Sequence, residues 1–476
     1  MRHRWLLVIL GGVYLAHQFF YRLYLGVSFE TDFGRLWQLL DAVWLREHLW
    51  ACLRDLHAQP PLHNLLLGAI LHLPEGLHDA AFETVHQMLA VGGLAALYAL
   101  AIALGLHRLV ALALTLFFLW TPSFILYQNW IASSLLLMTL STTALAGLGW
   151  YVRSGRTSYL HLAAAAGFLL TMTRPIYHSL WLLGMFILLA TARRHSSRRI
   201  CLHFAPYTLI LVAWLAKNAL LVGNFGMSTW FGMNLATGIT TRLTTAEADE
   251  LVATGVCTTI IRRAPWGSFD RYRDLDLVDA DEVTRWAGRP WLHDATRPDG
   301  RPNFNFIGYP RIADAYRTDA VRAYRARPDL YRQRAFDHYF LGLCRPSHRY
   351  RNFLDDNQRK LSAYSDWFAN YVEGDVLGQL VHIDFRKAYL DINVYTLGFP
   401  IALVAIPWFV LRWQRRHDDR WILLAAMGWT VGVQVAAIVL IDGGEGNRMR
   451  FEFEPLLLVV AALLATEGLS FVRRRE

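Results

Sequence analysis

Apolar segments long enough to cross a membrane are the feature that most constrains this chain of 476 residues. A helix needs about 20 residues to span the hydrocarbon core of a bilayer, and only helices or closed barrels can span it with every backbone group bonded. Hydrophobic residues make up 54% of the chain and charged residues 18%, which is typical of a polytopic membrane protein. We therefore expect an all-α polytopic membrane protein with about 10 transmembrane helices. Their segments lie near 5–25, 82–104, 109–126, 131–152, 158–173, 176–192, 201–223, 393–413, 421–441 and 455–472.

The basic residues lie in short clusters between the apolar segments. A net charge of +9 would favour a nucleic-acid-binding protein only if the basic residues shared one polar face. Their spacing instead follows the enrichment of Lys and Arg in cytoplasmic loops. We therefore expect no nucleic-acid partner and place both termini and all the clusters on the cytoplasmic side. The clusters are Arg2 with Arg4, Arg108, Arg153 with Arg156, and the stretches at 192–199, 412–420 and 473–475.

A short apolar segment at 63–73 interrupts this pattern, within the stretch LRDLHAQPPLHNLLLGAILHLPEGLHD at 53–79. Its 11 residues are too few to cross the bilayer, and counting them as a crossing would move later basic clusters to the other side. We expect this segment to stay on the outer face or to re-enter the membrane. Pro60 and Pro61 fit a helix start, so the pair either fixes the entry angle of a helix over 62–73 or only initiates it.

The first apolar segment, by contrast, is long, and no cleavage site of small residues follows it. A signal peptide would have a shorter apolar run and such a site. We interpret this segment as a retained helix.

This orientation divides the chain into three parts. Residues 1–223 form an N-terminal membrane core, 224–391 a mainly helical extracytoplasmic domain, and 392–476 the C-terminal transmembrane helices. A polar insert of this length is sufficient for a domain of its own. Its two cysteines, Cys257 and Cys344, either pair or stay free. The outer face also receives the loops at 26–81, 123–130, 173–178 and 442–455.

Two acidic residues, Glu30 and Asp32, directly follow the first apolar segment on its outer side. Apolar residues then recur at helical spacing, which predicts an amphipathic helix on the membrane surface. A carboxylate in that place is suited to act as a general base beside the lipid, but it would equally cap the N-terminus of the helix. The apolar residues are Leu36, Leu39, Leu40, Val43 and Trp44, with Arg35, Asp41 and Arg46 between them.

Three arginines stand out in outer loops that hold few other basic residues. Arg174 lies in TMTRPIYH between two apolar segments, and Arg448 and Arg450 lie in EGNRMRFEFEP before the last one. A guanidinium at that depth needs a partner, and its planar fork suits a phosphate. Of the last two, Arg448 is the better phosphate candidate. The alternative partners are the neighbouring glutamates Glu445, Glu452 and Glu454.

Taken in order, these features resemble the membrane glycosyltransferases of the GT-C class. The resemblance is nearest to the bacterial relatives of dolichyl-phosphate-mannose protein mannosyltransferases and to the lipid A aminoarabinose transferases. It covers about 1–222 and 391–476. Besides the outer acid and the amphipathic helix, the motifs are QPPLHNLLLG at 59–68, TRP at 173–175, NRMRFEFEPLLLVVAALL at 447–464 and the helix-to-domain junction WLAKNALLVGNFGMSTWFGMNLATG at 214–238.

The resemblance implies an integral membrane glycosyltransferase that moves a hexosyl or pentosyl group from a polyprenyl-phosphate-linked donor to a glycan, lipid or protein acceptor. It implies a multi-pass protein of the bacterial inner membrane with its site on the extracytoplasmic face. Asp32 would take the position of the acid that activates the acceptor hydroxyl, with Glu30 in support, while arginines stabilise the departing phosphate. The entry angle of the short helix would bring further substrate-binding residues beside that acid. These are Asp55, His57, Gln59 and His63.

Three departures from the family pattern affect these assignments. Asp32 is followed by Phe33 where the family commonly has Glu, which leaves open which acid is catalytic. Gln59 stands where the family has His before Pro-Pro, and the flanking His57 and His63 either contact substrate or are polar surface residues. The second outer loop reads YQNW and offers no acid. We therefore expect no cofactor, and a divalent metal would lack a ligand from that loop.

Two other classes of protein share several of these features. A lipid or glycan transporter, or flippase, has many helices and buried arginines, but it more often shows repeat symmetry and helices broken at mid-membrane. The sequence shows neither sign. A non-catalytic protein of cell-envelope assembly would use the outer domain to bind partners. Replacement of the catalytic acid separates these classes, because only an enzyme would lose glycan transfer.

Overall fold

Helices make up nearly all of the regular structure. The computed structural model describes residues 2–472 apart from 34, 35, 37, 192–196, 351, 352, 354, 374–383, 386, 387, 390–393 and 443. The helices before the insert are α1 (Arg2–Phe19), continued by a π-helical turn at Phe20–Tyr24, α2 (Ala42–Asp55), α3 (Leu62–Leu71), α4 (His78–Ala103), α5 (Arg108–Leu119), α6 (Pro122–Gln128), α7 (Ser134–Ser154), α8 (Thr157–Thr171), α9 (Ser179–Ala190) and α10 (Ser197–Val222). Those after it are α19 (Val394–Arg415), α20 (Arg420–Leu440), α21 (Gly446–Phe451) and α22 (Glu454–Val472).

The insert is also mainly helical. Its only described strands form one short antiparallel pair, in which Asp384 is opposite Tyr389. Its elements are α11 (Phe231–Thr240), α12 (Thr245–Ala253), α13 (Ala280–Thr284), α14 (Pro290–His293), α15 (Tyr309–Ala326), α16 (Pro328–Asp337), α17 (Asp355–Tyr371), β1 (Asp384–Phe385) and β2 (Ala388–Tyr389).

Every predicted apolar segment is helical, within a few residues of its predicted bounds. Among the described residues, four helices are long and apolar enough to cross a membrane: α4 with the turn before it, α7, α10 and α20. Helices α5 and α6 add a fifth if they count together, although they are bent by 65°. Helices α8 and α9, with 15 and 12 residues, are shorter than the roughly 20 that a crossing takes. The helical fold class is thus confirmed, and the expected number of about 10 spans is not.

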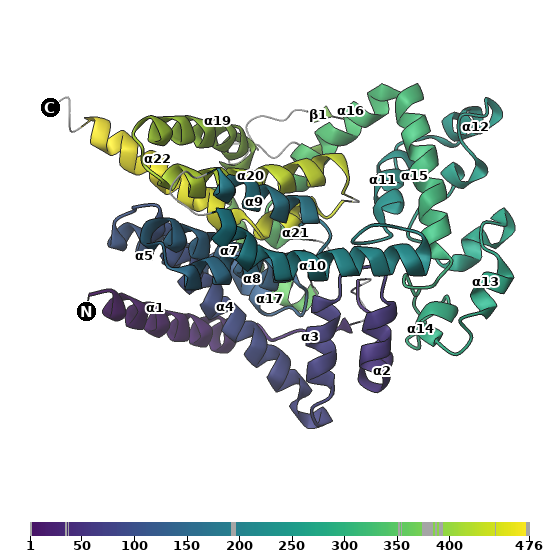
Figure 1. Ribbon diagram of the computed structural model, residues 1–476, viewed down its shortest axis with the longest axis horizontal. Coiled ribbons are helices and arrows are strands. Elements are labelled where there is room, and N and C mark those ends of the chain that lie inside the picture. Colours follow the sequence, from purple (N-terminus) through teal and green to yellow (C-terminus); the bar gives the residue numbers. More distant parts are fainter. Residues whose placement is uncertain are drawn as a thin grey trace.

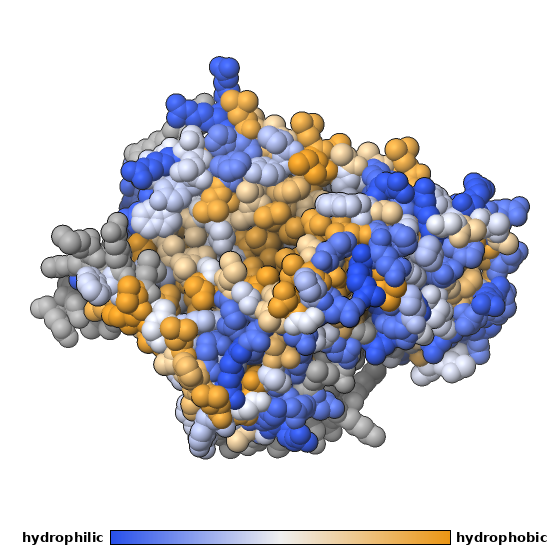
Figure 2. Space-filling view, turned by 90° about the horizontal axis from the view of Figure 1, so that it is seen from below, coloured by the Kyte–Doolittle hydropathy of each residue, from blue (hydrophilic) through white to orange (hydrophobic). Residues whose placement is uncertain are grey.

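The two termini lie at one end of the molecule, and α11 to α15 lie at the other (Figure 1). Two predicted cytoplasmic clusters meet at the end of α4, because Arg153 donates to the carbonyl of Ile102 at 2.6 Å and Arg420 donates to that of Leu104 at 3.0 Å. These clusters therefore lie on one side, as the charge pattern predicts. Hydrophobic side chains gather on the left and in the middle of the face in Figure 2, and mostly hydrophilic ones cover its right end. The stretches at 192–196 and 473–475 lie outside the described residues.

The insert has an outer part and a part that returns to the membrane helices. In the outer part, α11 and α15 cross closely, since a β-carbon at Gly232 would collide with the carbonyl of Ala313. Farther along the chain, Arg334 donates to the carbonyl of Asp442 at 2.8 Å. Asn357 of α17 donates to that of Ser28, also at 2.8 Å. The predicted domain at 224–391 therefore packs partly on the core. Its cysteines Cys257 and Cys344 are both buried, and no disulfide joins them.

The short helix α3 begins directly after the proline pair, as the sequence predicts. Both α2 and α3 lie across the direction of α1 and α10 (Figure 1), so α3 does not run with the long helices. The amide of Leu62 donates to the carbonyl of Met172 at 2.9 Å. This bond fixes the start of α3 to the loop that carries Arg174.

The amphipathic helix begins later than the sequence predicts. Helix α2 starts at Ala42, and Asp41 caps it by accepting a hydrogen bond from the amide of Val43 at 2.8 Å. Apolar spacing predicted a start before Leu36, but a capping carboxylate favours an extended backbone and ends the non-helical segment there. Glu30 and Asp32 therefore do not cap this helix, and that alternative is wrong.

Candidate functional site

A cavity of about 1310 Å³ lies where the predicted outer loops meet the ends of the membrane helices and the insert. Its walls come from α9, α10 and α20 on the membrane side and from α11 and α15 of the insert. The junction at 221–232 between α10 and α11 also lines it. The cavity therefore touches all three parts of the chain.

Helices α9 and α20 form the apolar wall, and two indoles join them. The Trp181 indole N–H donates to the hydroxyl of Thr430 at 3.1 Å, and that of Trp429 donates to the carbonyl of Trp181 at 3.1 Å. A β-carbon at Gly184 would collide with the Trp429 ring, so glycine permits this close approach. The other apolar lining residues of the two helices are Leu180, Val433, Ala436, Ala437 and Leu440.

Arg174 and Arg448 lie together at one end of the cavity and share Glu445. Arg174 donates to Glu445 Oε2 at 3.0 Å and to Glu452 Oε1 at 2.9 Å. Arg448 donates to the same oxygen of Glu445, and its guanidinium carbon lies 5.6 Å from the centre of the Tyr350 ring. The Tyr350 hydroxyl donates to the other oxygen of Glu445 at 2.8 Å. We call these five residues the arginine end of the cavity.

Burial and the two guanidiniums set the charge of the carboxyl groups at this end. Burial alone would raise the pKa of Glu445, but Arg448 and Arg174 hold that pKa below its usual value. Burial raises the pKa of Glu452 to about 7 despite its bond to Arg174. Burial also raises the pKa of the adjacent Asp442, and the charge of Glu445 adds to this effect. When Glu452 is protonated, the five residues of the arginine end carry two guanidiniums, Arg174 and Arg448, against one carboxylate, Glu445.

Arg450 lies apart from the described lining of the cavity. Its Nε donates to Glu454 at 2.8 Å, and its Nη1 donates to the carbonyls of Leu343 and Cys344, both at 3.1 Å. Its partner is the neighbouring glutamate, which is the alternative that the sequence left open. Of the three predicted phosphate ligands, the structure brings only Arg174 and Arg448 together.

Asp55 joins the end of α2 to the insert. Its buried carboxylate accepts hydrogen bonds from Arg289 Nη1 at 3.2 Å and from the Trp291 indole at 3.1 Å. It also accepts one from Arg54 Nε at 2.9 Å. These partners satisfy the charge away from the arginine end, so Asp55 holds two parts of the chain together.

The next two candidates along this loop have different surroundings. The His57 ring lies between the hydroxyl of Thr229 at 3.1 Å and the carbonyl of Asn305 at 2.9 Å. Burial lowers the pKa of His57 to about 3, so the ring is neutral and serves to anchor the loop. Gln59, by contrast, lines the large cavity together with the arginine end.

Glu30 and His63 both hold the segment at 129–131. The amide of Glu30 donates to the carbonyl of Asn129 at 2.9 Å, and the carbonyl of Glu30 accepts from the amide of Ile131 at 3.2 Å. His63 Nε2 lies 3.1 Å from the carbonyl of Ile131. Neither residue belongs to the described lining of the large cavity.

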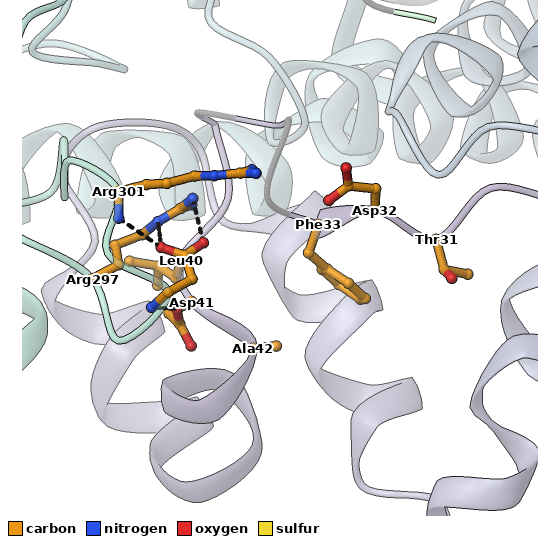
Figure 3. A pocket seen from close by; sticks show the side chains of 9 residues that line it. Thr31, Asp32, Phe33, Leu40, Asp41, Ala42, Arg297 and Arg301 are labelled. Carbon is orange, nitrogen blue, oxygen red and sulfur yellow. Dashed lines mark hydrogen bonds and ion pairs between the residues drawn. The ribbon is translucent and has the colours of Figure 1, made fainter. Parts of the chain in front are cut away.

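Asp32 lines a second cavity, of about 350 Å³. Arg297, Asp299 and Arg301 of the insert form its opposite wall. In Figure 3 the Arg301 side chain extends toward the Asp32 carboxylate, and Asp41 lies below Arg297. The guanidinium of Arg297 donates to Asp299 Oδ2 at 2.8 Å.

The two cavities share a stretch of chain as part of their walls. Leu36 and Gln38 line the large cavity, whereas Leu40 and Asp41 line the small one. The sequence predicted that Asp55, His57 and Gln59 lie beside Asp32, and the structure does not bring them there. The reason is that Asp55 and His57 are bound to the insert, and that Gln59 lines the large cavity whereas Asp32 lines the small one.

Two residues of the large cavity were missed from the sequence as functional candidates. Asp442 begins the outer stretch DGGEGNRMRFEFEP, so its place before a glycine pair was a usable signal. Tyr350 lies in the insert, and no local pattern indicates that its hydroxyl reaches Glu445. In the part of the chain that the structure describes, no group of three or more His, Cys, Asp or Glu is placed to hold a metal ion.

No protein-family model matches the chain, and no curated protein does either. Two solved structures of ArnT from Cupriavidus metallidurans are similar to it, one in the apo state and one bound to undecaprenyl phosphate, each with 14% identity. The matches cover 92% and 91% of this chain and 77% and 76% of those chains, with TM-scores of 0.36 and 0.35. ArnT is a lipid A aminoarabinose transferase of the GT-C class, the group that the sequence motifs resemble. TM-scores this low do not establish a shared fold, so the residues of the cavity carry the functional conclusion.

Proposed function

We propose that this protein is an integral membrane glycosyltransferase of a bacterial inner membrane. It moves a sugar from a polyprenyl-phosphate-linked donor to a glycan, lipid or protein acceptor on the outer face. The observation that carries the proposal is the make-up of the large cavity, which combines buried guanidiniums, an apolar wall of membrane helices and a polar wall of the insert. A lipid-linked donor has a charged phosphate, an apolar tail and a sugar, and a site for it needs a surface for each of them in one cavity.

The arginine end supports a site for the donor phosphate. Arg174 and Arg448 present two planar forks, which suit the oxygens of a phosphate. Both are already paired with Glu445, so a bound phosphate takes over bonds that Glu445 makes. Protonation of Glu452 leaves Arg174 with one ionised partner fewer. An anion gains from this exchange, whereas a neutral ligand would leave the buried ion pairs as they are.

The wall formed by α9 and α20 supports a place for the lipid tail. Leu180 and Trp429 line the cavity and are also exposed at the molecular surface. The cavity therefore continues into an outward hydrophobic surface of the membrane helices. A polyprenyl chain on this surface would replace lipid, at no cost in exposed apolar area.

The transfer itself is a displacement at the anomeric carbon of the donor. The acceptor oxygen forms a bond to this carbon while the bond to the phosphate oxygen breaks. The electron pair leaves with the phosphate, whose charge the two guanidiniums stabilise. The proton of the acceptor hydroxyl goes to a carboxylate that acts as general base. No cofactor takes part in this scheme.

Two carboxylates compete for the role of base. Asp442 lines the large cavity next to Glu445, and its raised pKa suits a proton acceptor. Asp32, with Glu30 in support, is the base that the family resemblance implies, but it lines the small cavity. Asp442 is therefore our first choice, and Asp32 takes the role only if the donor sugar reaches the small cavity.

Binding of undecaprenyl phosphate to the purified protein tests the phosphate site. Glu445→Gln keeps the shape but removes the internal competitor, so we expect binding to tighten about tenfold, or by ~1.4 kcal/mol. Arg448→Lys keeps the charge but loses the fork, so we expect a loss of similar size. Arg420→Lys, at the far end of α20, is the matched control and should bind as the wild type does. Equal affinity in all four proteins contradicts the site.

Release of undecaprenyl phosphate from its hexosyl and pentosyl esters, in membrane vesicles that hold natural acceptors, tests the base. We expect Asp442→Asn to slow release by about 10²–10⁴-fold and to keep its melting temperature, because an amide oxygen still accepts from the amides of Gly444 and Glu445. If only Asp32→Asn slows the release, the general base is Asp32. Binding of the lipid without any sugar release overturns the transferase and favours a transporter.

A further inference from the structure

The insert end of the large cavity has an aromatic cluster that the proposed phosphate chemistry does not use. Trp266 and Trp230 both line the cavity, and their ring centres lie 5.0 Å apart in an edge-to-face arrangement. Phe304 closes the cluster behind them, with its ring centre 5.4 Å from that of Trp266. Edge-to-face contacts of this kind hold aromatic rings in fixed positions.

Trp266 has a backbone conformation that side-chain-bearing residues rarely adopt. Its φ is 67°, and such a residue is strained by about 1–3 kcal/mol unless its surroundings enforce the conformation. Here the surroundings include the ring contacts and a hydrogen bond from the Trp266 indole to the hydroxyl of Thr237 at 3.0 Å. The fold thus maintains strain to keep this indole at the cavity wall, where it remains partly exposed.

The polar groups around Trp266 are neutral in sum. Asn234 lines the cavity one turn before Thr237 on α11, and no group within the described residues bonds to its side-chain amide. On α15, Arg317 pairs with Asp314 at 2.5 Å. Arg311, also on α15, pairs with Glu282 at 3.6 Å. This wall therefore offers hydrogen-bond donors and acceptors without the excess positive charge of the arginine end.

We propose that this wall is the acceptor subsite and that it binds a neutral carbohydrate ring. The indole of Trp266 provides a flat surface for the apolar C–H face of a sugar, and the amide of Asn234 both donates to and accepts from its hydroxyls. An anionic acceptor group gains nothing here, because each arginine already has an acid partner. The inference rests on the proposed function and adds the substrate class to it.

Saturation-transfer NMR with a set of neutral methyl glycosides, namely those of glucose, galactose, mannose and arabinose, tests this subsite in the purified full-length protein. We expect at least one glycoside to bind, and Trp266→Ala and Asn234→Ala each to weaken it about fivefold. Trp367→Ala, which removes an exposed tryptophan of α17 outside the cavity, should leave binding unchanged. Melting temperatures identify a variant that fails to fold. If Trp266→Ala fails to fold, glycoside binding to Asn234→Ala decides the result, because Asn234 is only partly buried.

Undecaprenyl phosphate binding is measured on the same samples to separate this inference from the proposed function. Loss of glycoside binding with intact lipid binding in Trp266→Ala supports the subsite. Glycoside binding that is equal in wild type and both variants overturns the subsite but not the proposed function. The same holds if the wild type binds tetramethylammonium, a cation, and none of the glycosides. Absence of lipid binding in the wild type overturns the proposed function, whatever the glycosides do.

Discussion

The two ends of the large cavity contain the same kind of ion pair in different surroundings. At the arginine end, Arg448 pairs with Glu445, and 1% of the Arg448 side chain and 28% of the Glu445 side chain are exposed. At the insert end, Arg317 pairs with Asp314 with 54% and 63% of the side chains exposed. A buried pair has lost its hydration and depends on its partner, whereas water and salt screen an exposed one. One end of the cavity is therefore organised by charge, and the other is only polar.

The largest expected effect comes from breaking the buried pair. Arg448→Ala leaves Glu445 with a single cationic partner in a mostly buried site, so we expect the free energy of unfolding to fall by up to about 3–5 kcal/mol. Denaturant or thermal unfolding in detergent measures this change, with Arg448→Lys as the variant that keeps the charge. A loss below about 1 kcal/mol would mean that water reaches the pair and screens it, which removes the contrast between the two ends.

The next effect is a pH dependence that belongs to the arginine end alone. The folded-state pKa of Glu452, about 7, lies above its ordinary value of 4.5, so the folded protein keeps a proton that the unfolded chain releases. The resulting stability is fully present below about pH 4.5 and is lost as the pH rises through about 7. At ~1.4 kcal/mol per pKa unit it reaches up to roughly 3 kcal/mol.

Glu452→Gln tests this dependence because it keeps the neutral form at every pH. Unfolding of wild type and variant should be compared across pH 4.5 to 7, the interval between the two pKa values. The unfolding free energy of the wild type, relative to that of the variant, should fall as the pH rises. Parallel curves would show that folding does not shift the pKa of Glu452, so that this group is ionised near neutral pH and Arg174 is fully paired.

The helices could be predicted because apolar segments of spanning length have few alternatives in lipid. The short helix α3 could be predicted as well, since Pro60 and Pro61 lack amide donors and mark its start. The beginning of α2 was missed because apolar spacing alone gives no boundary. There the decisive residue is Asp41, whose carboxylate bonds to the amide of Val43.

The cavity could be predicted only in part. Arg174 and Arg448 were recognisable because guanidiniums are rare in short outer loops. That they share Glu445 could not be predicted, because Arg174 and Glu445 are 271 positions apart in the sequence. The separation of Asp32 from the arginines depends on where the insert packs, and no periodicity reports this. Likewise, the positive φ of Trp266 has no sequence signal beyond its position between a proline and a glycine.

A smaller effect is expected from Gly232, which brings α11 and α15 together at the insert end. Gly232→Ala places a methyl group against the carbonyl of Ala313, and overpacking of this kind typically costs about 1–3 kcal/mol. Because the change moves the wall that carries Asn234 and Thr237, methyl glycoside binding should weaken while undecaprenyl phosphate binding stays the same. Equal losses of both would mean that the two ends respond as one unit.

The smallest effect is expected from the exposed pair. Arg317→Ala removes the partner of Asp314, but this carboxylate is mostly hydrated, so the free energy of unfolding should change by only about 0–1 kcal/mol. The change should shrink further at high salt, because screening weakens what remains of the attraction. A double-mutant cycle with Asp314→Asn isolates the pair from the packing of the arginine stem. A coupling free energy as large as that of Arg448 with Glu445 would show that the insert end is desolvated too, and a neutral sugar would then have no advantage over an anion at this wall.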